Sequence, residues 1–397
     1  MRNAFAFLLF LIIAGSCRHN KKSSDPILTS NTIVNSLEIE NRISDSIELE
    51  LREIADCLHI VRLETLNSVV MGGIYSMVID ENYMVIGSEK DYFLFDVKGR
   101  FIRMLLKTGR GPEEFILPLF SQVIRNGILY FSDAIKNKNF IYSIDLKTGS
   151  LDRIPRYNTG YIQYLIPDTD TTFIVLSEVS ERDKNTPLSA TIDYSLIRQD
   201  LKGNLLNEIP LGVFKGASPF LPTRYQMFIN DRDTLISTPR FDTLYRFSNF
   251  KIRPVWYNNF NTNYNDQLPA QKIPNAALVH YSDSLILFEK YITDINANRI
   301  MNRNNQLLIL DRINNKVKII KKLYFEDSDM PLGFSGDIRL NDDQFCIVLK
   351  ARDINIMLKN PLINKSVSDL IVPDLPRTDR PITDFDNPFL LIGKFRN

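Results

Sequence analysis

A short unit of alternating strands and turns recurs along the chain, and no other feature limits the fold as strongly. Residues 83–106 read YMVIGSEKDYFLFDVKGRFIRMLL: an apolar run, a polar break, a second run ending in Asp96, a turn and a third run. Residues 127–154 repeat this order, and Asp145 stands 49 residues after Asp96. A glycine follows each Asp by three or four residues, as hairpin turns favour, because glycine supplies positive φ and Asp bonds to its own backbone. The pattern predicts repeated antiparallel strands.

Four weaker copies follow, and together the six copies define an architecture. The weaker copies occupy residues 171–209, 233–257, 283–325 and 343–395. Six units over residues 66–397 average about 55 residues, compared with ~40–50 for a four-stranded propeller blade. We therefore predict an all-β fold, a six-bladed β-propeller formed by residues 41–397.

One strand remains outside the six units. LHIVRLET, residues 58–65, has no unit of its own, whereas the sixth unit lacks an outer strand. If this N-terminal strand completes the last blade, the ring closes and two unpaired strand edges disappear. We expect IELELREIADC, residues 47–57, to form a strand and one helical turn that lead into this closure.

Two other architectures fit the pattern less well. A doubly wound α/β fold needs helices of 10–15 residues between its strands. LREIAD is the only amphipathic helical segment that we expect, and residues 360–386 are expected to form a polar, proline-containing insertion in the sixth unit. A β-sandwich is the structural alternative, but it does not account for repeats of this length.

The N-terminus has the features of a targeting segment. Arg2 precedes the apolar residues 4–13, too few to cross a ~30 Å hydrocarbon core as a helix, and three small residues then lead to Cys17. This is the layout of a secretory signal peptide, here residues 1–16. IAGSC also resembles the lipobox of bacterial lipoproteins, which implies a diacylglycerol attached to Cys17. The alternative is an ordinary signal peptide that leaves Cys17 as a free thiol.

The glycine-containing loop KTGRGPEEF, residues 107–115, does not fit a nucleotide site. A P-loop requires G-x-x-x-x-G-K-[ST] and a dinucleotide loop requires G-x-G-x-x-G, whereas Gly109 and Gly111 are followed by a proline and two glutamates. The loop lies between the first two units. We therefore expect the glycines to turn the chain, Pro112 to stiffen the exit and Phe115 to anchor the crossing into the second blade.

The same region resembles a known repeat. Residues 109–149 are similar to an NHL-type propeller repeat in Gly109, Gly111, Pro112, Glu114, Phe115, Pro118, Asp133, Asn139, Asp145 and Gly149. Together with RLET (62–65) and NPFLLIGKF (387–395), these residues resemble the six-bladed propeller lipoproteins of Bacteroidetes, with NHL-like or TolB-like repeats, over nearly the whole mature chain. The resemblance implies a fold and a lipid-anchored place in the cell envelope, and it implies no reaction.

The segment after Cys17 bears on the location. Residues 17–40 are mostly polar and are expected to form a flexible tether, of which about 20 residues reach roughly 25 Å. In Bacteroidetes-like lipoproteins, surface export is associated with acidic residues after the cysteine. The flank here is basic (Arg18, Lys21, Lys22), so we expect the periplasmic side of the outer membrane rather than the cell surface.

Composition and motifs indicate little chemistry. The 48 basic and 47 acidic residues leave a net charge of +1, without the basic excess typical of nucleic-acid binding. The three histidines, His19, His59 and His280, are far apart in the sequence and suggest no metal site. No cofactor is predicted, although a Ca²⁺ ion held by oxygen ligands in the channel stays open. Pairing of Cys57 with Cys346 also stays open, although the apolar run FCIVL favours a buried thiol at Cys346.

Two loops that mix aromatic and polar residues are the candidate ligand sites. RYNTGYIQY (156–164) contains Tyr161, and PVWYNNFNTNYN (254–265) contains Trp256, Tyr257 and Phe260. Rings offer stacking area and amides offer hydrogen bonds, which suits a sugar or a peptide. The alternative is that these rings fill the space between blades.

These observations favour a non-catalytic binding module, a monomer attached to the membrane by its N-terminal lipid. Its ligand would be a glycan, a peptide or an envelope protein, and we expect no nucleic-acid partner. The alternative is a metal-dependent lyase or hydrolase with a divalent ion in the propeller channel.

Overall fold

The fold is described from a computed structural model of residues 1–397. The structure describes residues 35–37, 43–66 and most of residues 69–396. The stretches of five or more residues outside this description are 1–34, 38–42, 134–138, 183–189, 218–224, 259–271, 327–331, 334–343 and 372–380. Residues 32–397 form one compact unit. No helix among the described residues is long and apolar enough to span a membrane.

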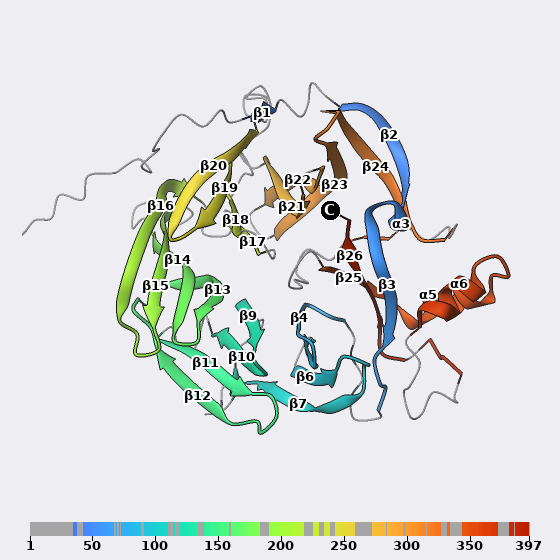
Figure 1. Cartoon of the computed structure of the whole chain (residues 1–397), viewed down its shortest axis with the longest axis horizontal. Helices are drawn as coiled ribbons and strands as arrows, with labels where there is room; N and C mark the ends of the chain where they lie inside the picture. The colour runs from blue at the N-terminus through green and yellow to red at the C-terminus, as the bar shows by residue number, and fades with distance from the viewer. Residues whose placement is uncertain are drawn as a thin grey trace, which may run out of the picture. The chain divides into compact units, whose positions relative to one another are not determined.

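Six antiparallel sheets stand in a ring, which confirms the predicted six-bladed propeller (Figure 1). The first three blades consist of β4 (Ser76–Ile79), β5 (Tyr83–Gly87), β6 (Asp91–Asp96) and β7 (Phe101–Thr108); β9 (Phe120–Arg125), β10 (Ile128–Ser132), β11 (Phe140–Asp145) and β12 (Leu151–Pro155); and β13 (Tyr161–Thr169), β14 (Thr172–Arg182), β15 (Ala190–Asp200) and β16 (Leu205–Ala217). In each of them the first strand lies nearest the centre of the ring (Figure 1).

The last three blades follow the same order. They consist of β17 (Gln226–Ile229), β18 (Thr234–Ser237), β19 (Thr243–Ser248) and β20 (Lys251–Asn258); β21 (Lys272–Tyr281), β22 (Leu285–Asn296), β23 (Arg299–Asp311) and β24 (Lys316–Tyr324); and β25 (Gln344–Leu349), β26 (Phe389–Phe395) and β3 (Ala55–Arg62). The first five sequence repeats begin at the second strand of their blades, so the inner strands β4, β9, β13, β17 and β21 precede the predicted units, whereas the sixth repeat begins at β25.

The N-terminal strand completes the last blade, as predicted. β3 pairs antiparallel with β26, and Arg62 lies opposite Phe389. The segment before it also has the expected form: strand β2 (Ile43–Glu50) runs into the helical turn α3 (Leu51–Ile54), and Glu50 and Glu53 form a capping box at its start. Such a box satisfies backbone donors that a helix start leaves unpaired.

A buried polar network, here called the closure network, joins the segment at the end of β3 to the segment just before β26, where the ring closes. Arg62 Nη2 lies 3.1 Å from Asp386 Oδ2. Asn387, fully buried, accepts from the Met71 amide at 2.9 Å and donates to the carbonyl oxygens of Glu64 and Val69 at 2.9 and 3.0 Å. Thus the RLET and NPFLLIGKF segments, on which the family resemblance depends, hold the ring closed.

Three short extra strands cover outer edges of blades. β1 (Asn35–Leu37), at the end of the predicted tether, pairs parallel with β20, β2 pairs parallel with β24, and β8 (Glu114–Phe115) pairs parallel with β7. The acidic β2 lies against a basic edge, with Glu48 opposite Lys322. Covered edges protect a sheet from pairing with other chains.

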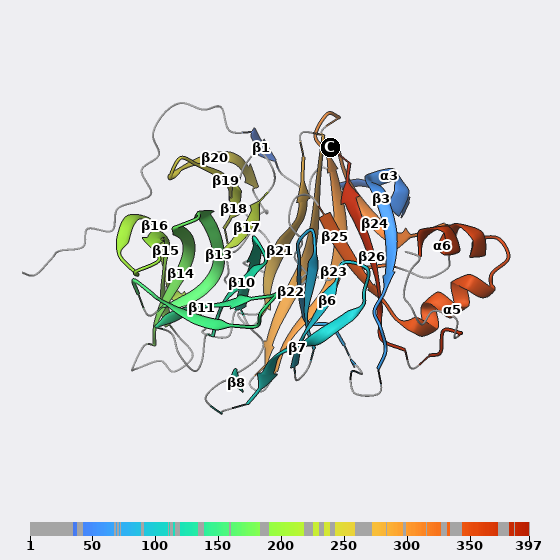
Figure 2. The ribbon, with the colours of Figure 1, turned by 60° about the horizontal axis from the view of Figure 1, so that its bottom comes forward.

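The expectation of a single helical turn is wrong, because the sixth blade carries two further helices between β25 and β26. They are α5 (Ala351–Lys359) and α6 (Asn364–Leu370), and they project from the rim of the ring (Figure 2). Buried Ile354 and Met357 on α5 and Val367 on α6 pack onto the sixth blade. α5 lies where the sequence suggested the end of a strand, and α6 lies within the expected polar insertion.

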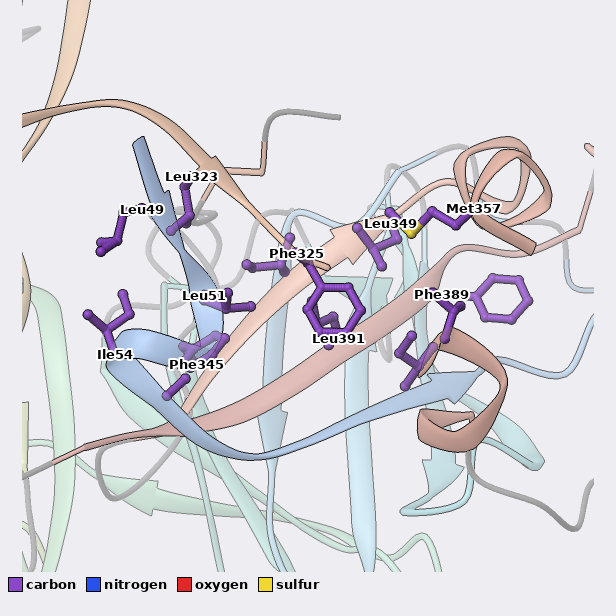
Figure 3. Packing of buried hydrophobic residues seen from close by; sticks show 14 of the residues in the cluster. Leu49, Leu51, Ile54, Leu323, Phe325, Phe345, Leu349, Met357, Phe389 and Leu391 are labelled. Carbon is purple, nitrogen blue, oxygen red and sulfur yellow. The ribbon is translucent and has the colours of Figure 1, made fainter. Parts of the chain in front are cut away.

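Apolar clusters fill each space between neighbouring blades. The cluster between the fifth and sixth blades joins Leu323 and Phe325 to Phe345, Phe389 and Leu391, and it also takes in the inner side of α5 (Figure 3). Burial of each such side chain contributes about 1.5–3 kcal/mol. Since no blade buries both of its faces alone, the ring is stable only as a closed whole.

The repeated Asp and Gly residues have a structural role at the turns between the third and fourth strands. Asp96 Oδ1 accepts from the amides of Lys98 and Arg100 at 3.0 and 2.9 Å. Gly99 has φ +86°, and a Cβ there would lie 2.1 Å from the Arg62 carbonyl oxygen, at the end of the preceding blade's outer strand. Gly203 repeats this close approach to Pro155. The glycine is thus required by both conformation and space.

Candidate functional site

The candidate site lies on the face of the ring where the inner strands begin, here called the proximal face. Neighbouring strands within each blade are antiparallel, and each connection from an outer strand returns to the next inner strand. The inner strands therefore all start on the same face. The connections that contain residues 107–115 and 156–164 both lead to this face.

Exposed tyrosines mark this face. Tyr75 directly precedes β4 and is 50% exposed, and Tyr161 is the first residue of β13 and is 37% exposed. Tyr157, in the connection to β13, is 44% exposed. Glu178 on β14 is the residue paired with Tyr161, so their side chains lie on the same side of the sheet. Large rings left in solvent offer stacking area for a ligand.

A polar contact between the first two blades lies close to Tyr75. Gln122 Nε2 on β9 is 3.1 Å from both Ser76 Oγ and Tyr92 Oη, and the two oxygens are 3.0 Å apart. A Cβ on the neighbouring Gly87 would lie 2.4 Å from Ser76 Oγ. The inner strands are thereby held in place at this face by hydrogen bonds between blades as well as by apolar packing.

The connection from β12 to β13 is held by a partly buried guanidinium. Arg156 Nη2 donates to the Gly160 carbonyl oxygen at 2.6 Å and to Asn158 Oδ1 at 3.3 Å, and Ser177 Oγ lies 3.1 Å from the same amide oxygen. Burial lowers the pKa of Arg156 to about 10, so it stays charged at neutral pH. A Cβ on Gly160 would meet the Glu178 carbonyl oxygen at 2.6 Å. The loop therefore presents Tyr157 and Tyr161 from a fixed backbone.

An amide and a carboxylate stand beside these rings. Gln163 Nε2 on β13 donates to Glu178 Oε2 on β14. Both side chains are partly exposed. Gln163 lies two residues after Tyr161, and Glu178 is the residue paired with Tyr161. Stacking rings next to hydrogen-bonding groups can bind a sugar or a peptide backbone.

The aromatic residues proposed from the sequence do not lie together. Tyr161 lies on the proximal face. Trp256 is buried among Leu235, Leu244 and Leu278 between the fourth and fifth blades, so its inclusion as a ligand-face residue is corrected: its ring fills the space between blades. Tyr257 belongs to β20, its side chain lies outside the described residues, and so do Phe260 and Cys17.

The loop of residues 107–115 forms a compact turn. The Gly111 amide donates to Glu114 Oε2 at 2.8 Å, and the Gly109 amide donates to the Phe115 carbonyl oxygen at 3.1 Å. Phe115 is buried and packs edge-to-face on Phe131 and Tyr142 of the second blade, with ring centroids 5.1 Å apart in both pairs. Pro112 lies outside the described residues.

Candidate groups for metal or redox chemistry are dispersed. Among the described residues, no three His, Cys, Asp or Glu side chains converge as a metal site would need. Cys57 is exposed and Cys346 is buried, and both are free thiols. His280, on β21, is buried and stacks on Phe395 of the sixth blade, with ring centroids 4.3 Å apart.

Sequence reasoning missed several members of the site. Tyr75 lies just before an inner strand of only four residues, which carries too little alternation to be recognised. Tyr92 and Gln122 belong to different blades, so they come into contact only in the folded ring. Of the exposed tyrosines on this face, Tyr161 and Tyr157 stood in a loop whose mixture of rings and amides was visible in the sequence.

The fold and the site define a closed six-bladed propeller with an aromatic face. The chain belongs to the family described as Domain of unknown function (DUF4934), whose model matches residues 34–394. None of the curated proteins matches the sequence.

Solved structures of similar fold include a Bacteroides fragilis NCTC 9343 protein described as exported. It is 14% identical, with a TM-score of 0.56, and the match covers 92% of this chain and 100% of that one. Two weaker matches are the Pan2 WD40 domain of Neurospora crassa (11% identity, TM-score 0.36, 90% and 98% covered) and the propeller domain of the Trilobed protease from Pyrococcus furiosus (13%, 0.31, 69% and 78%). At 14% identity the Bacteroides fragilis match bears on the fold alone.

Proposed function

We propose that this protein is an exported, non-catalytic binding module that holds a glycan or a peptide on its proximal face. The observation that carries the proposal is the set of exposed tyrosines, Tyr75, Tyr157 and Tyr161, of which the last two stand on a loop fixed by partly buried hydrogen bonds. A rigid aromatic surface binds with little loss of conformational entropy, because a tyrosine has only two side-chain torsions to fix. Gln163 and Glu178 would give the ligand its orientation.

The location proposed for this module is the cell envelope. The match to a protein described as exported supports export. The finer placement, on the periplasmic side of the outer membrane through a lipid on Cys17, comes from the lipobox-like IAGSC and the basic flank after it. More than one acyl chain is needed for stable anchoring, and a diacylglycerol supplies two.

Removal of the exposed rings is expected to weaken ligand binding. A glycan library and a peptide library are screened by thermal shift, and the best ligand is titrated against Tyr157→Ala and Tyr161→Ala. Loss of one stacking ring should weaken binding roughly tenfold. Tyr245→Ala, on β19 away from this loop, serves as the matched control. Equal affinities for all three variants would contradict the proposal, and turnover of a library member would favour the alternative lyase or hydrolase.

Substitution of Cys17 is expected to abolish lipid attachment. In cells fed radiolabelled palmitate, the unmodified chain should take up label and fractionate with membranes, whereas Cys17→Ala should do neither, because the thiol is the acceptor. Cys57→Ala, which removes an exposed thiol of the propeller, is the matched control and should keep the label. Membrane retention of Cys17→Ala at the level of the unmodified chain would refute the anchor.

A further inference from the structure

The helical projection, residues 350–371, is an insertion between β25 and β26 of the sixth blade. Its inner side is firmly held: Ile354, Met357, Ile363 and Val367 are buried against the sixth blade. At its end Ile371 forms a parallel bridge with Ile60 of β3. The projection is therefore a rigid feature that presents its outer side at the rim of the ring (Figures 1 and 2).

The outer side combines apolar and basic residues. Arg352, Ile356 and Lys359 are exposed and are spaced four and three residues apart, so they share one side of α5. Ile356 is 52% exposed. Leu362, in the turn between α5 and α6, is 85% exposed, the highest value among the large apolar residues that the structure describes as exposed. Leu362 and Ile356 therefore leave two aliphatic side chains open to solvent on the outer side of the projection.

The projection carries a net positive charge. Lys350, Arg352, Lys359 and Lys365 stand against Asp353 and Asp369. None of the four basic residues forms an ion pair with another described residue. The lysines of β24 differ, because the acidic strand β2 lies beside them. Lys359 and Lys365 lie three residues before and three residues after Leu362, so basic residues flank the most exposed apolar residue on both sides.

We propose that the helical projection docks on an anionic phospholipid surface. Leu362 and Ile356 would enter the boundary between headgroups and acyl chains, and the lysines and Arg352 would contact the phosphates. Amphipathic helices with basic polar sides bind membrane interfaces in this way, and long basic side chains reach the headgroup level while their stems stay on apolar surface. Binding should be salt-sensitive, because clustered Lys and Arg are attracted by anionic lipid.

A protein partner fits these observations less well. Protein interfaces concentrate their binding energy in aromatic and arginine residues packed in a central patch. The projection instead offers two separate aliphatic side chains surrounded by lysines, a pattern suited to shallow insertion. The proposal is independent of the proximal-face ligand and of the lipid on Cys17, since it concerns a contact made by the folded body itself.

Tryptophan fluorescence tests the contact directly on the full chain. Trp256, the only native tryptophan, is buried, so its emission gives a constant background. Leu362→Trp is mixed with vesicles of phosphatidylglycerol and phosphatidylcholine, and we expect a blue shift and quenching by brominated acyl chains. Ile313→Trp, at a turn of the fifth blade that is 79% exposed, is the matched control and should show neither change. Equal responses at both positions, or no response at 362, would overturn the proposal.

Co-sedimentation with the same vesicles tests the charge. Lys359→Gln and Lys365→Gln should each lower vesicle affinity roughly fivefold, and vesicles of pure phosphatidylcholine should bind far less protein. These positions are exposed, so unchanged thermal unfolding will show that the fold is intact. If both variants bind anionic vesicles as the unmodified chain does, the basic residues have no part in docking and the proposal fails. Binding of the projection to an envelope protein with no vesicle binding would also refute it.

Discussion

Substitution of Asn387 by leucine is expected to be the most destabilising single change in the closure network. The asparagine is fully buried, and its side chain serves the Met71 amide and the carbonyl oxygens of Glu64 and Val69. Leucine has nearly the same shape but leaves all three backbone groups unpaired. Each buried unsatisfied group costs about 1–3 kcal/mol, so the free energy of unfolding should fall by roughly 3–9 kcal/mol. Urea unfolding followed by circular dichroism measures the change.

The matched control for this experiment is Asn207→Leu on β16, where the asparagine is exposed. It makes the same chemical change without leaving buried groups unpaired, so its effect should stay within about 0.5 kcal/mol. If the free energy of unfolding falls as little for Asn387→Leu as for Asn207→Leu, the closure of the ring does not depend on this network. Because the partners of Asn387 lie more than 300 residues away in sequence, the loss should affect the ring as a whole.

The second large effect is a loss of stability on acidification that depends on His280. Burial lowers the pKa of His280 from 6.5 to about 4 in the folded protein. Between these values the unfolded chain binds a proton that the folded chain does not, so stability is highest above pH 6.5 and falls as the pH drops towards 4. The difference amounts to about 3 kcal/mol for the single group. Protonation would place a charge between the fifth and sixth blades, against the ring of Phe395.

Unfolding free energies at pH 7 and pH 4.5 in the unmodified chain and in His280→Gln measure this contribution. Other groups titrate in both proteins, so their effects cancel in the comparison. The variant should lose less stability between the two pH values by most of the predicted amount. Equal losses in the unmodified chain and in His280→Gln would show that the buried ring is not responsible.

The ring was predictable from sequence because its repeats are local. Each blade forms its hairpins between neighbouring segments, so the alternation of apolar residues and the Asp and Gly of the turns are visible within about 25 residues, as in residues 83–106. The closure by residues 58–65 was predictable as well, since an unpaired strand at one end matched a missing strand at the other. The inner strands β4 and β17 were not recognised, because they have only four residues each.

The two helices of the sixth blade were missed for a different reason. The apolar residues of ARDINIMLK fit a helix once Leu349 ends the strand before it, but in the sequence they continue directly from FCIVL. The side of α5 that faces the blade is decided by Leu349, Phe389 and Leu391, which come from separate strands. Short helices of this kind gain most of their stability from such packing rather than from their own propensity.

By itself the sequence determined the fold class, the number of blades and the strand that closes the ring, because all of these depend on local patterns. Only the tertiary structure decided what lies together. It buried Trp256 between blades, exposed Tyr75 and Tyr161 on the same face, linked Asn387 to residues near position 70 and placed Leu362 at the end of a projection. Burial and contact between distant segments are properties of the closed ring, and no short stretch of sequence carries them.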